Sequence, residues 1–254
     1  MNNTEINLIL SSPHIAPEIK AMWQYKLRLN LIVTNDPRML ELKRRVELLH
    51  DRTESVLILG ESGTGKELIA HALHGNRKGL FIKINCSGLP SELIESELFG
   101  HTKGAFTGAV DNRVGKLVAA KDGSIFLDEI GDMPIPMQAK LLRALDAKEV
   151  TPLGSNTPIP VNCRIISATN KSQEIYDKKQ FRLDLLHRIG MFVLHTTPYR
   201  ERRGDIHELI DALYDVGHKI PPQVREIIAN MDLYGNAREI ESLCLNYIVF
   251  SEMK

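Results

Sequence analysis

Short continuous apolar runs alternate along this chain with stretches in which apolar positions recur every three or four residues. A run of four to six apolar residues between turn residues predicts a buried strand, and the wider spacing predicts an amphipathic helix. Strands that alternate with helices indicate a parallel sheet with helices on both faces, an α/β fold. The strands predicted in this way span residues 56–59, 81–84, 124–127, 164–168 and 191–194.

The pattern changes after Pro198, where only helical spacing remains, in residues 206–213, 224–228 and 240–250. We therefore expect an α/β core over residues 33–204 and a small all-helical lid over residues 205–254, with the boundary near Gly204. Residues 1–32 match no pattern and have no predicted role. Trp23, the only tryptophan, is expected to anchor this segment by packing.

A glycine-rich turn joins the first predicted strand to a helix predicted over residues 66–73. Glycines in this position let backbone N–H groups turn onto phosphate oxygens, and the helix N-terminus adds a favourable dipole. A lysine at the end of the turn reaches the β- and γ-phosphates, so the turn predicts an ATP-binding P-loop. Its residues are Gly60, Glu61, Ser62, Gly63, Thr64, Gly65 and Lys66.

Two features refine this prediction. Glu67 stands where the general motif has the Ser or Thr that contacts magnesium, which indicates altered metal ligation or an inactive site. Asp128 and Glu129 end a later apolar strand, where Asp128 can hold Mg²⁺ and Glu129 can polarise the attacking water as a general base. For the acidic pair alone, a solvated strand end is the other interpretation. Asn170 ends the next strand and can orient that water through its amide.

A glycine-flanked hexapeptide lies between the P-loop and the acidic pair. One aromatic and one hydroxyl residue between glycines can form a hairpin tip that presents Phe106 and Thr107 to a partner, although the hexapeptide alone favours a generic surface turn. The hexapeptide consists of Gly104, Ala105, Phe106, Thr107, Gly108 and Ala109.

The preceding residues favour the partner loop. Residues 95–103, Glu-Ser-Glu-Leu-Phe-Gly-His-Thr-Lys, followed by the hexapeptide, closely resemble the signature of the sigma-54 activator family, the bacterial enhancer-binding proteins. Thr102 is the one local departure, because the family usually has Glu there. The resemblance covers residues 33–250, and it includes Glu67, since the family has Glu at the same position.

The resemblance implies an AAA+ ATPase core that assembles as a ring of six subunits. Such a ring hydrolyses ATP with Mg²⁺ between subunits and uses the hexapeptide loop to remodel the sigma-54 RNA polymerase holoenzyme at a closed promoter. In this family Asn85 matches the switch asparagine that contacts the base glutamate, although a plain strand-end cap is its other interpretation. Asn170 matches the first sensor. Arg238 matches the second sensor in the lid, where Leu-Tyr-Gly at residues 233–235 replaces the usual Trp-Pro-Gly.

Arg182 and Arg188 lie six residues apart on a predicted helix and match the arginine fingers of the family. An arginine supplied across a subunit boundary neutralises charge that develops on the transferred phosphoryl group. A solvated helix with two surface arginines is the alternative interpretation. The charged run 199–206 resembles the linker into the lid, whose charges are expected to pair between subunits.

Charge and composition narrow the function further. Lys plus Arg and Asp plus Glu both total 32, so no strong positive field points to a nucleic-acid binder. Residues 241–254 leave no room for a helix-turn-helix, and we expect either an excised core or an activator that works without DNA binding. Cys86, Cys163 and Cys244 lack metal spacing, which favours reduced thiols in the cytoplasm. We expect no membrane segment and no metal at His71 and His74, which lack a third ligand.

Two other classes of protein would share part of this pattern. A generic AAA+ DNA remodeller, such as a helicase loader, would share the ATP-binding residues without needing the hexapeptide. A catalytically silent interaction module would keep the fold and lose Glu129, Asn170 or an arginine finger, and this chain has all of them.

Overall fold

The computed structural model describes residues 29–88, 90–214 and 220–251, which form two compact units. The first unit contains the described residues within Met1–His50, Gly60–Ala72 and His195–Lys254, and the second contains those within Asp51–Leu59 and Leu73–Leu194. Trp23 lies outside the described residues. This division differs from the predicted domain boundaries after residues 32 and 204, which remain predictions.

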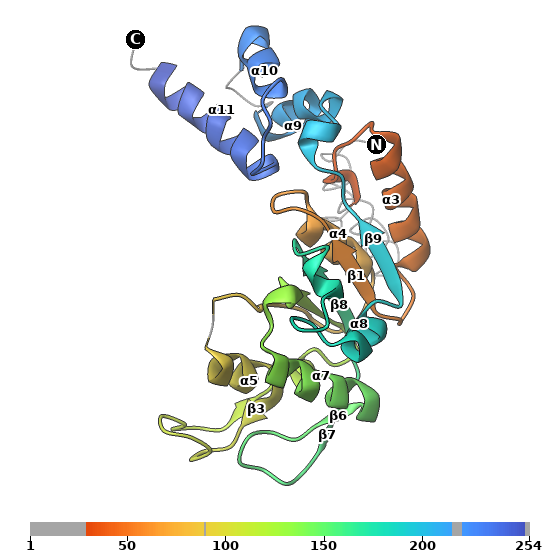
Figure 1. Cartoon of the computed structure of the whole chain (residues 1–254), viewed down its shortest axis with the longest axis vertical. Coiled ribbons are helices and arrows are strands. Elements are labelled where there is room, and N and C mark those ends of the chain that lie inside the picture. Colours follow the sequence, from red (N-terminus) through yellow and green to blue (C-terminus); the bar gives the residue numbers. More distant parts are fainter. Residues whose placement is uncertain (1–28, 89, 215–219, 252–254) are drawn as a thin grey trace, which may run out of the picture. The chain divides into compact units, whose positions relative to one another are not determined.

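A parallel five-stranded sheet forms the centre of the second unit (Figure 1). All five strands predicted from apolar runs are confirmed, and their ends differ from the predicted ends by at most one residue. The strand order is β2-β5-β8-β1-β9, with the bounds β1 (Val56–Leu59), β2 (Phe81–Asn85), β5 (Ser124–Asp128), β8 (Arg164–Thr169) and β9 (Phe192–His195).

One face of this sheet is buried under helices of the second unit. Alternate residues of a strand point to the same face, so Leu57 and Leu59 of β1 share a face with Ile125 and Leu127 of β5. These side chains belong to one continuous apolar core with residues of several helices. The longest of these helices are α5 (Ser91–Phe99), α7 (Ile135–Ala147) and α8 (Leu183–Ile189).

Two short antiparallel ladders project from this unit and each closes a hairpin-like loop. The first joins β3 (Gly100–His101) to β4 (Arg113–Val114), and the second joins β6 (Glu149–Val150) to β7 (Ile159–Pro160). The remaining short elements of the unit are α6 (Lys116–Ala119), η1 (Ile130–Asp132) and η2 (Glu174–Tyr176).

The first unit is helical in its described part. The three predicted C-terminal helices are confirmed as α9 (Gly204–Tyr214), α10 (Pro222–Ala229) and α11 (Ala237–Ser251), which enclose a small apolar core with η3 (Tyr199–Glu201). The unit also contains α3 (Pro37–Leu49) and the first residues of α4 (Lys66–His74), the helix predicted over residues 66–73.

Helix α3 begins at a capped turn. The Asp36 side chain accepts hydrogen bonds from the backbone N–H groups of Arg38 and Met39, and Pro37 occupies the first helical position. The hydrogen bond from the Arg38 side chain is the main cause that lowers the pKa of Asp36 below its usual value. The carboxylate therefore stays ionised, and keeps its cap, to a lower pH than an unpaired aspartate would.

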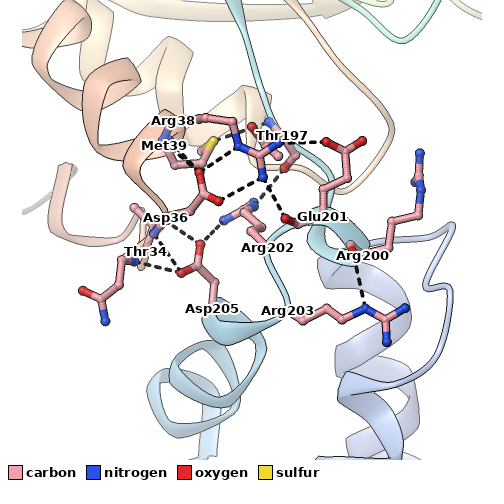
Figure 2. Close-up of polar contacts among 11 residues, drawn as sticks. Thr34, Asp36, Arg38, Met39, Thr197, Arg200, Glu201, Arg202, Arg203 and Asp205 are labelled. Atoms are coloured by element: carbon pink, nitrogen blue, oxygen red, sulfur yellow. Dashed lines mark hydrogen bonds and ion pairs between the residues drawn. The ribbon is translucent and has the colours of Figure 1, made fainter.

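A buried carboxylate ties the start of α9 to the segment before α3 (Figure 2). Asp205 accepts hydrogen bonds from Thr34 Oγ1 at 2.5 Å and from the Asn35 backbone N–H at 2.8 Å, and its Oδ2 lies 3.1 Å from Arg202 Nη1. The side chains of Arg202 and Asp205 are 1% and 2% exposed. Arg202 also donates from Nε to the Thr197 carbonyl at 2.8 Å, so both buried charges have several partners.

The charges of the run 199–206 pair within the chain. Arg38 reaches Glu201 at 3.0 Å, Arg202 reaches Asp205, and Arg203 lies 3.9 Å from Asp232. Pairing between subunits, which the sequence resemblance implied, stays a prediction.

Within the described residues, no helix is both long and apolar enough to cross a membrane.

We predict that Asp205→Ala lowers the free energy of unfolding by about 3–5 kcal/mol, because it leaves the buried Arg202 guanidinium without its carboxylate. Urea denaturation followed by circular dichroism measures this loss. Asp232→Ala is the matched control, since Asp232 is 71% exposed, and it should change stability by no more than about 0.5 kcal/mol. Equal effects of the two substitutions would contradict the role assigned to Asp205.

Candidate functional site

The predicted P-loop lies in the first unit and leads into α4, which begins at Lys66. Lys66 is only 7% exposed. Its ammonium donates to the backbone carbonyls of Gly60 at 2.9 Å and Glu61 at 3.1 Å, so the loop curls around the lysine. Thr64 Oγ1 donates to the Glu61 carbonyl at 2.8 Å and lies 2.7 Å from Thr196 Oγ1. The loop is thus ordered by its own side chains.

Residues at the start of α11 lie directly against the P-loop. Arg238 Nη1 donates to Ser62 Oγ at 2.9 Å, and the Ala237 backbone N–H donates to the Gly63 carbonyl at 3.1 Å. The structure therefore brings the predicted second-sensor arginine to the predicted phosphate loop. Its action on a nucleotide remains a prediction.

A second group of candidate residues lies at one edge of the sheet in the other unit. Asn85 and Asp128 are register partners at the ends of β2 and β5, and Glu129 follows directly. Glu129 has a left-handed backbone conformation, with φ 50° and ψ 48°. This conformation is unfavourable for a residue with a Cβ atom and is concentrated at functional sites.

The Glu129 carboxylate is held by the predicted first sensor. Its Oε2 accepts a hydrogen bond from the Asn170 backbone N–H at 2.9 Å. Asn85 points elsewhere in this structure, because its Oδ1 accepts from the Ser87 backbone N–H at 2.9 Å and from Ser87 Oγ at 2.8 Å. These contacts match the strand-end cap that sequence reasoning left open for Asn85.

Asp128 has a partner that the sequence did not reveal. Lys83 Nζ lies 3.2 Å from Asp128 Oδ2, and the Asp128 side chain is 17% exposed. A cationic group against this carboxylate shows that the position favours positive charge, and carboxylate oxygens are the ligands that Mg²⁺ prefers. Asp128 thus supplies one carboxylate that could bind Mg²⁺ in place of Lys83, and metal binding at this position remains a prediction.

The hexapeptide occupies the end of the β3–β4 hairpin, as predicted. The Gly104 N–H donates to the Ala109 carbonyl at 2.9 Å, and the Ala109 N–H donates to the Phe106 carbonyl at 3.0 Å. Thr107 is exposed, but Phe106 is only half-exposed. That both side chains face a partner stays a prediction, although Phe106 is partly buried in this structure.

The cause is a ring contact with His101. The Phe106 and His101 rings meet edge to face with centroids 5.0 Å apart, and His101 Nδ1 lies 2.7 Å from Ser96 Oγ. Thr102, the residue that departs from the family pattern, uses both its N–H (2.9 Å) and its Oγ1 (3.2 Å) to donate to the Leu153 carbonyl. The β6–β7 loop thus supports the hexapeptide hairpin.

The two candidate arginine fingers differ in their local structure. Arg188 lies on α8, where its Nη2 donates to the Leu145 carbonyl at 2.9 Å. Arg182 precedes α8 and has an extended backbone, so the prediction that both lie on one helix is wrong for Arg182. Its side chain pairs with Asp184 at 2.6 Å, and this hydrogen bond raises the pKa of the Arg182 guanidinium.

Gln138 explains the extended backbone at Arg182. It is fully buried on α7, and its Oε1 accepts from the Arg182 backbone N–H at 2.8 Å. Its Nε2 donates to the carbonyls of Met133 at 2.8 Å and Gln180 at 3.1 Å. Sequence reasoning missed this residue, because a glutamine within an amphipathic helix gives no signal of its own.

The other chemically reactive candidates have structural explanations. Burial raises the pKa of the thiols of Cys86 and Cys163 to about 12, so both are protonated and unreactive at neutral pH. His74 Nδ1 lies 3.0 Å from Ser124 Oγ, and no cluster of three potential metal ligands occurs among the residues that the structure describes.

Comparison with known proteins places the chain in a family. The sequence model of the family described as "Sigma-54 interaction domain" matches residues 32–195, more than half of the chain. The chain belongs to the Sigma-54 interaction domain family. It is 48% identical over 203 residues to the transcriptional regulatory protein GlrR of Escherichia coli, covering 78% of this chain and 44% of GlrR.

A second member of the Sigma-54 interaction domain family is similarly close. The chain is 42% identical over 222 residues to the anaerobic nitric oxide reductase transcription regulator NorR of Aeromonas hydrophila, covering 83% of this chain and 44% of NorR. The chain thus spans less than half the length of the curated relatives that it matches.

Solved structures confirm that this member of the family has the AAA+ fold. NtrX from Brucella abortus in complex with ATP has a TM-score of 0.77 and 28% identity, covering 87% of this chain and 53% of that one. The yeast Hsp104–ADP complex, at 18% identity and a TM-score of 0.61, covers 99% of this chain and 50% of its own and shares the fold alone.

We predict that Gln138→Met, which keeps the volume of the side chain, lowers the free energy of unfolding by about 2–4 kcal/mol. The substitution leaves the Arg182 N–H and two carbonyls without their buried partner. Urea denaturation measures the change. Gln173→Met is the control, since Gln173 is exposed and its side chain caps no helix, and it should leave the midpoint unchanged.

Proposed function

We propose that this chain is the ATP-hydrolysing core of a sigma-54-dependent transcriptional activator, which remodels the sigma-54 RNA polymerase closed complex through its Gly104–Ala109 loop. The observation that carries the ATPase assignment is the Glu129–Asn170 hydrogen bond, formed where Glu129 adopts a strained left-handed conformation. A carboxylate held in this way is oriented before substrate arrives, as a general base requires.

The P-loop and the sheet edge provide complementary parts of this chemistry. Leu59 ends β1 at the edge where its register partner Thr169 ends β8, and the P-loop follows Leu59 directly in the chain. We propose that the P-loop amides and Lys66 bind the phosphates. Lys66 now donates to two loop carbonyls, so binding the β- and γ-phosphates exchanges these acceptors for charged oxygens.

Asp128 would hold Mg²⁺, which would supply positive charge against the phosphates. Glu67, the residue directly after the P-loop lysine, would also belong to the cofactor-binding set. Glu129 would polarise the attacking water, and Asn170 would keep the carboxylate aimed at it. Arg238 would contact the nucleotide from the start of α11, and Asn85 would exchange Ser87 for Glu129 in another nucleotide state.

The remaining parts of the proposal concern the assembly of the chain into a ring and its contact with sigma-54. Arg182 and Arg188 would act on the ATP of a neighbouring copy in a ring of six, exchanging their present acidic or carbonyl partners for phosphate oxygens. Thr107 and Phe106 would contact sigma-54, and release of Phe106 from His101 would expose the full aromatic surface. The protein would act in the cytoplasm, where the holoenzyme is found.

We predict that Glu129→Gln lowers the rate of ATP hydrolysis by about 10²–10⁴-fold, because the amide cannot accept a proton from water. Binding of a fluorescent ATP analogue should remain close to that of the wild type, and EDTA should abolish hydrolysis by the wild type. Glu149→Gln, at an exposed position on β6, is the matched control and should hydrolyse ATP normally. Normal turnover by Glu129→Gln would reject the assigned base.

We predict that Thr107→Ala and Phe106→Ala hydrolyse ATP at a rate within about threefold of the wild type, because the hairpin tip contributes no phosphate or metal ligand. Both should lose binding to sigma-54 in the presence of a transition-state mimic of ATP, measured by native gel shift. Thr53→Ala, an exposed threonine before β1, controls for the loss of a surface hydroxyl. If the loop variants retain sigma-54 as tightly as the wild type, the loop is not the contact.

A further inference from the structure

Glu61 lies in the P-loop, but its carboxylate is bound by a side chain from η3. Arg200 forms a two-pronged ion pair with it: Nη1 lies 2.5 Å from Oε2 and Nη2 lies 2.5 Å from Oε1. This fork-to-fork geometry is the strongest form of an arginine–carboxylate contact and fixes direction as well as distance. The residues are 139 positions apart in sequence.

Asn236 adds a second connection to the same carboxylate. It is fully buried, and its Nδ2 lies 3.2 Å from Glu61 Oε2 and 2.9 Å from the Ser62 carbonyl. Its Oδ1 accepts from the Tyr199 backbone N–H at 2.8 Å. One side chain at the start of α11 therefore joins η3 to the P-loop.

The backbones approach closely at the same place. Gly63 has φ 74°, and a Cβ atom on it would overlap the carbonyl oxygen of Gly235. Only glycine allows both the conformation and the approach. The P-loop and the turn before α11 are therefore packed against each other without intervening side chains.

The far side of Arg200 is also anchored. Its guanidinium lies 5.6 Å from the centre of the Tyr234 ring. In Figure 2, the Arg200 side chain points away from the cluster around Asp205, which fixes the following residues at the start of α9. The contacts around Asp205 thus position the residues that follow Arg200, while the Arg200 side chain reaches the P-loop.

The negative charge of Glu61 is unexpected in a loop that binds phosphate, and its ion pair with Arg200 accounts for it. A free carboxylate in a phosphate-binding loop would repel a nucleotide, and the Arg200 hydrogen bond is the main cause that lowers the pKa of Glu61 and keeps it ionised. The ion pair neutralises this charge and holds it against η3. Cofactor binding by Glu61 as part of the P-loop backbone stays a prediction, while its side chain binds Arg200 and Asn236.

We infer that Glu61, Arg200 and Asn236 form a latch through which the position of η3 and helices α9–α11 sets the phosphate-binding conformation of the P-loop. The three are positioning residues: they act on a nucleoside triphosphate through the loop backbone. The inference rests on the proposed function in one respect, that the P-loop binds ATP. It adds that α9–α11 respond to the γ-phosphate through this latch.

A plain surface ion pair would behave differently. Arg200 and Glu61 are 27% and 39% exposed, and pairs of this kind add little to stability. A structural pair therefore predicts small effects on both unfolding and nucleotide binding. A latch predicts a small effect on unfolding with a large effect on nucleotide affinity.

The test is a double-mutant cycle of Glu61→Gln, Arg200→Gln and the double variant, using binding of a fluorescent ATP analogue with Mg²⁺. We expect each single variant to raise Kd about tenfold and the double variant to be no weaker than either single, because one interaction is lost in all three. Arg200→Lys, which keeps the charge and loses the fork, should fall between Arg200→Gln and the wild type. Thermal unfolding midpoints should change little.

Amide hydrogen exchange provides a second measurement, which a purely structural ion pair between Glu61 and Arg200 would leave unchanged. Saturating ATP analogue should alter amide exchange of α9–α11 in the wild type and not in Arg200→Gln. Arg45→Gln is the matched control, because Arg45 forms its ion pair within α3, with Glu41 at 3.1 Å. It should bind nucleotide and respond like the wild type.

The outcomes separate the two claims. If the wild type does not bind the ATP analogue, the proposed function itself is wrong. If the wild type binds and Arg200→Gln binds equally well, if the losses in the cycle add, or if Arg45→Gln weakens binding as much, the latch is wrong and the proposed function stands. Because Glu61→Gln alters the P-loop itself, the two Arg200 variants decide the result should that protein fail to fold.

Discussion

Parallel strands end at a common edge, and the candidate chemistry of the second unit depends on this constraint. The ladder pairs Asn85 with Asp128 and Leu59 with Thr169, so residues far apart in sequence end their strands together. The left-handed turn at Glu129 then directs its carboxylate to the N–H of Asn170. Neither the acid pair nor the sensor would be in place if the strands paired in another register, because a shift of one residue reverses every side chain.

Buried charge organises the first unit in a different way. Lys66, Arg202 and Asp205 are all nearly inaccessible, and each is satisfied by carbonyls, hydroxyls or an opposite charge. Such groups are costly to bury without partners. They therefore restrict the unit to arrangements that keep every partner. The connection from η3 into α9 is positioned by these requirements more than by the apolar packing of its few residues.

The parts of this protein that were predictable are those with local signals. Apolar runs located all five strands of the sheet, and glycine spacing before Lys66 located the P-loop at the start of α4. The acid pair at the end of β5 was visible because it ends an apolar strand that follows the P-loop in the chain. These features depend on neighbours in sequence, and a single chain contains that information.

The parts that were missed depend on residues that meet only after folding. Glu61 finds Arg200 139 positions later and Asn236 175 positions later, and the Arg182 N–H finds Gln138 44 positions earlier. Lys83 resembled any polar residue of a strand until β2 and β5 paired and brought it to Asp128. Charge composition could not indicate these pairs, because the totals of 32 basic and 32 acidic residues do not say which charges meet.

The hexapeptide hairpin contains both a feature that was predictable from local sequence and a contact that forms only on folding. Its glycines predicted a turn, but the position of Phe106 was set by His101, whose ring lies beside it through the short β3–β4 ladder. Thr102 departs from the family pattern, and its two hydrogen bonds to the Leu153 carbonyl connect the hairpin to the β6–β7 loop. A glutamate at position 102 would bring a negative charge to a carbonyl oxygen and could not donate from its side chain. The threonine therefore connects the two loops through an uncharged side chain that donates a hydrogen bond. The glutamate that is usual in the family would need another contact for its side chain.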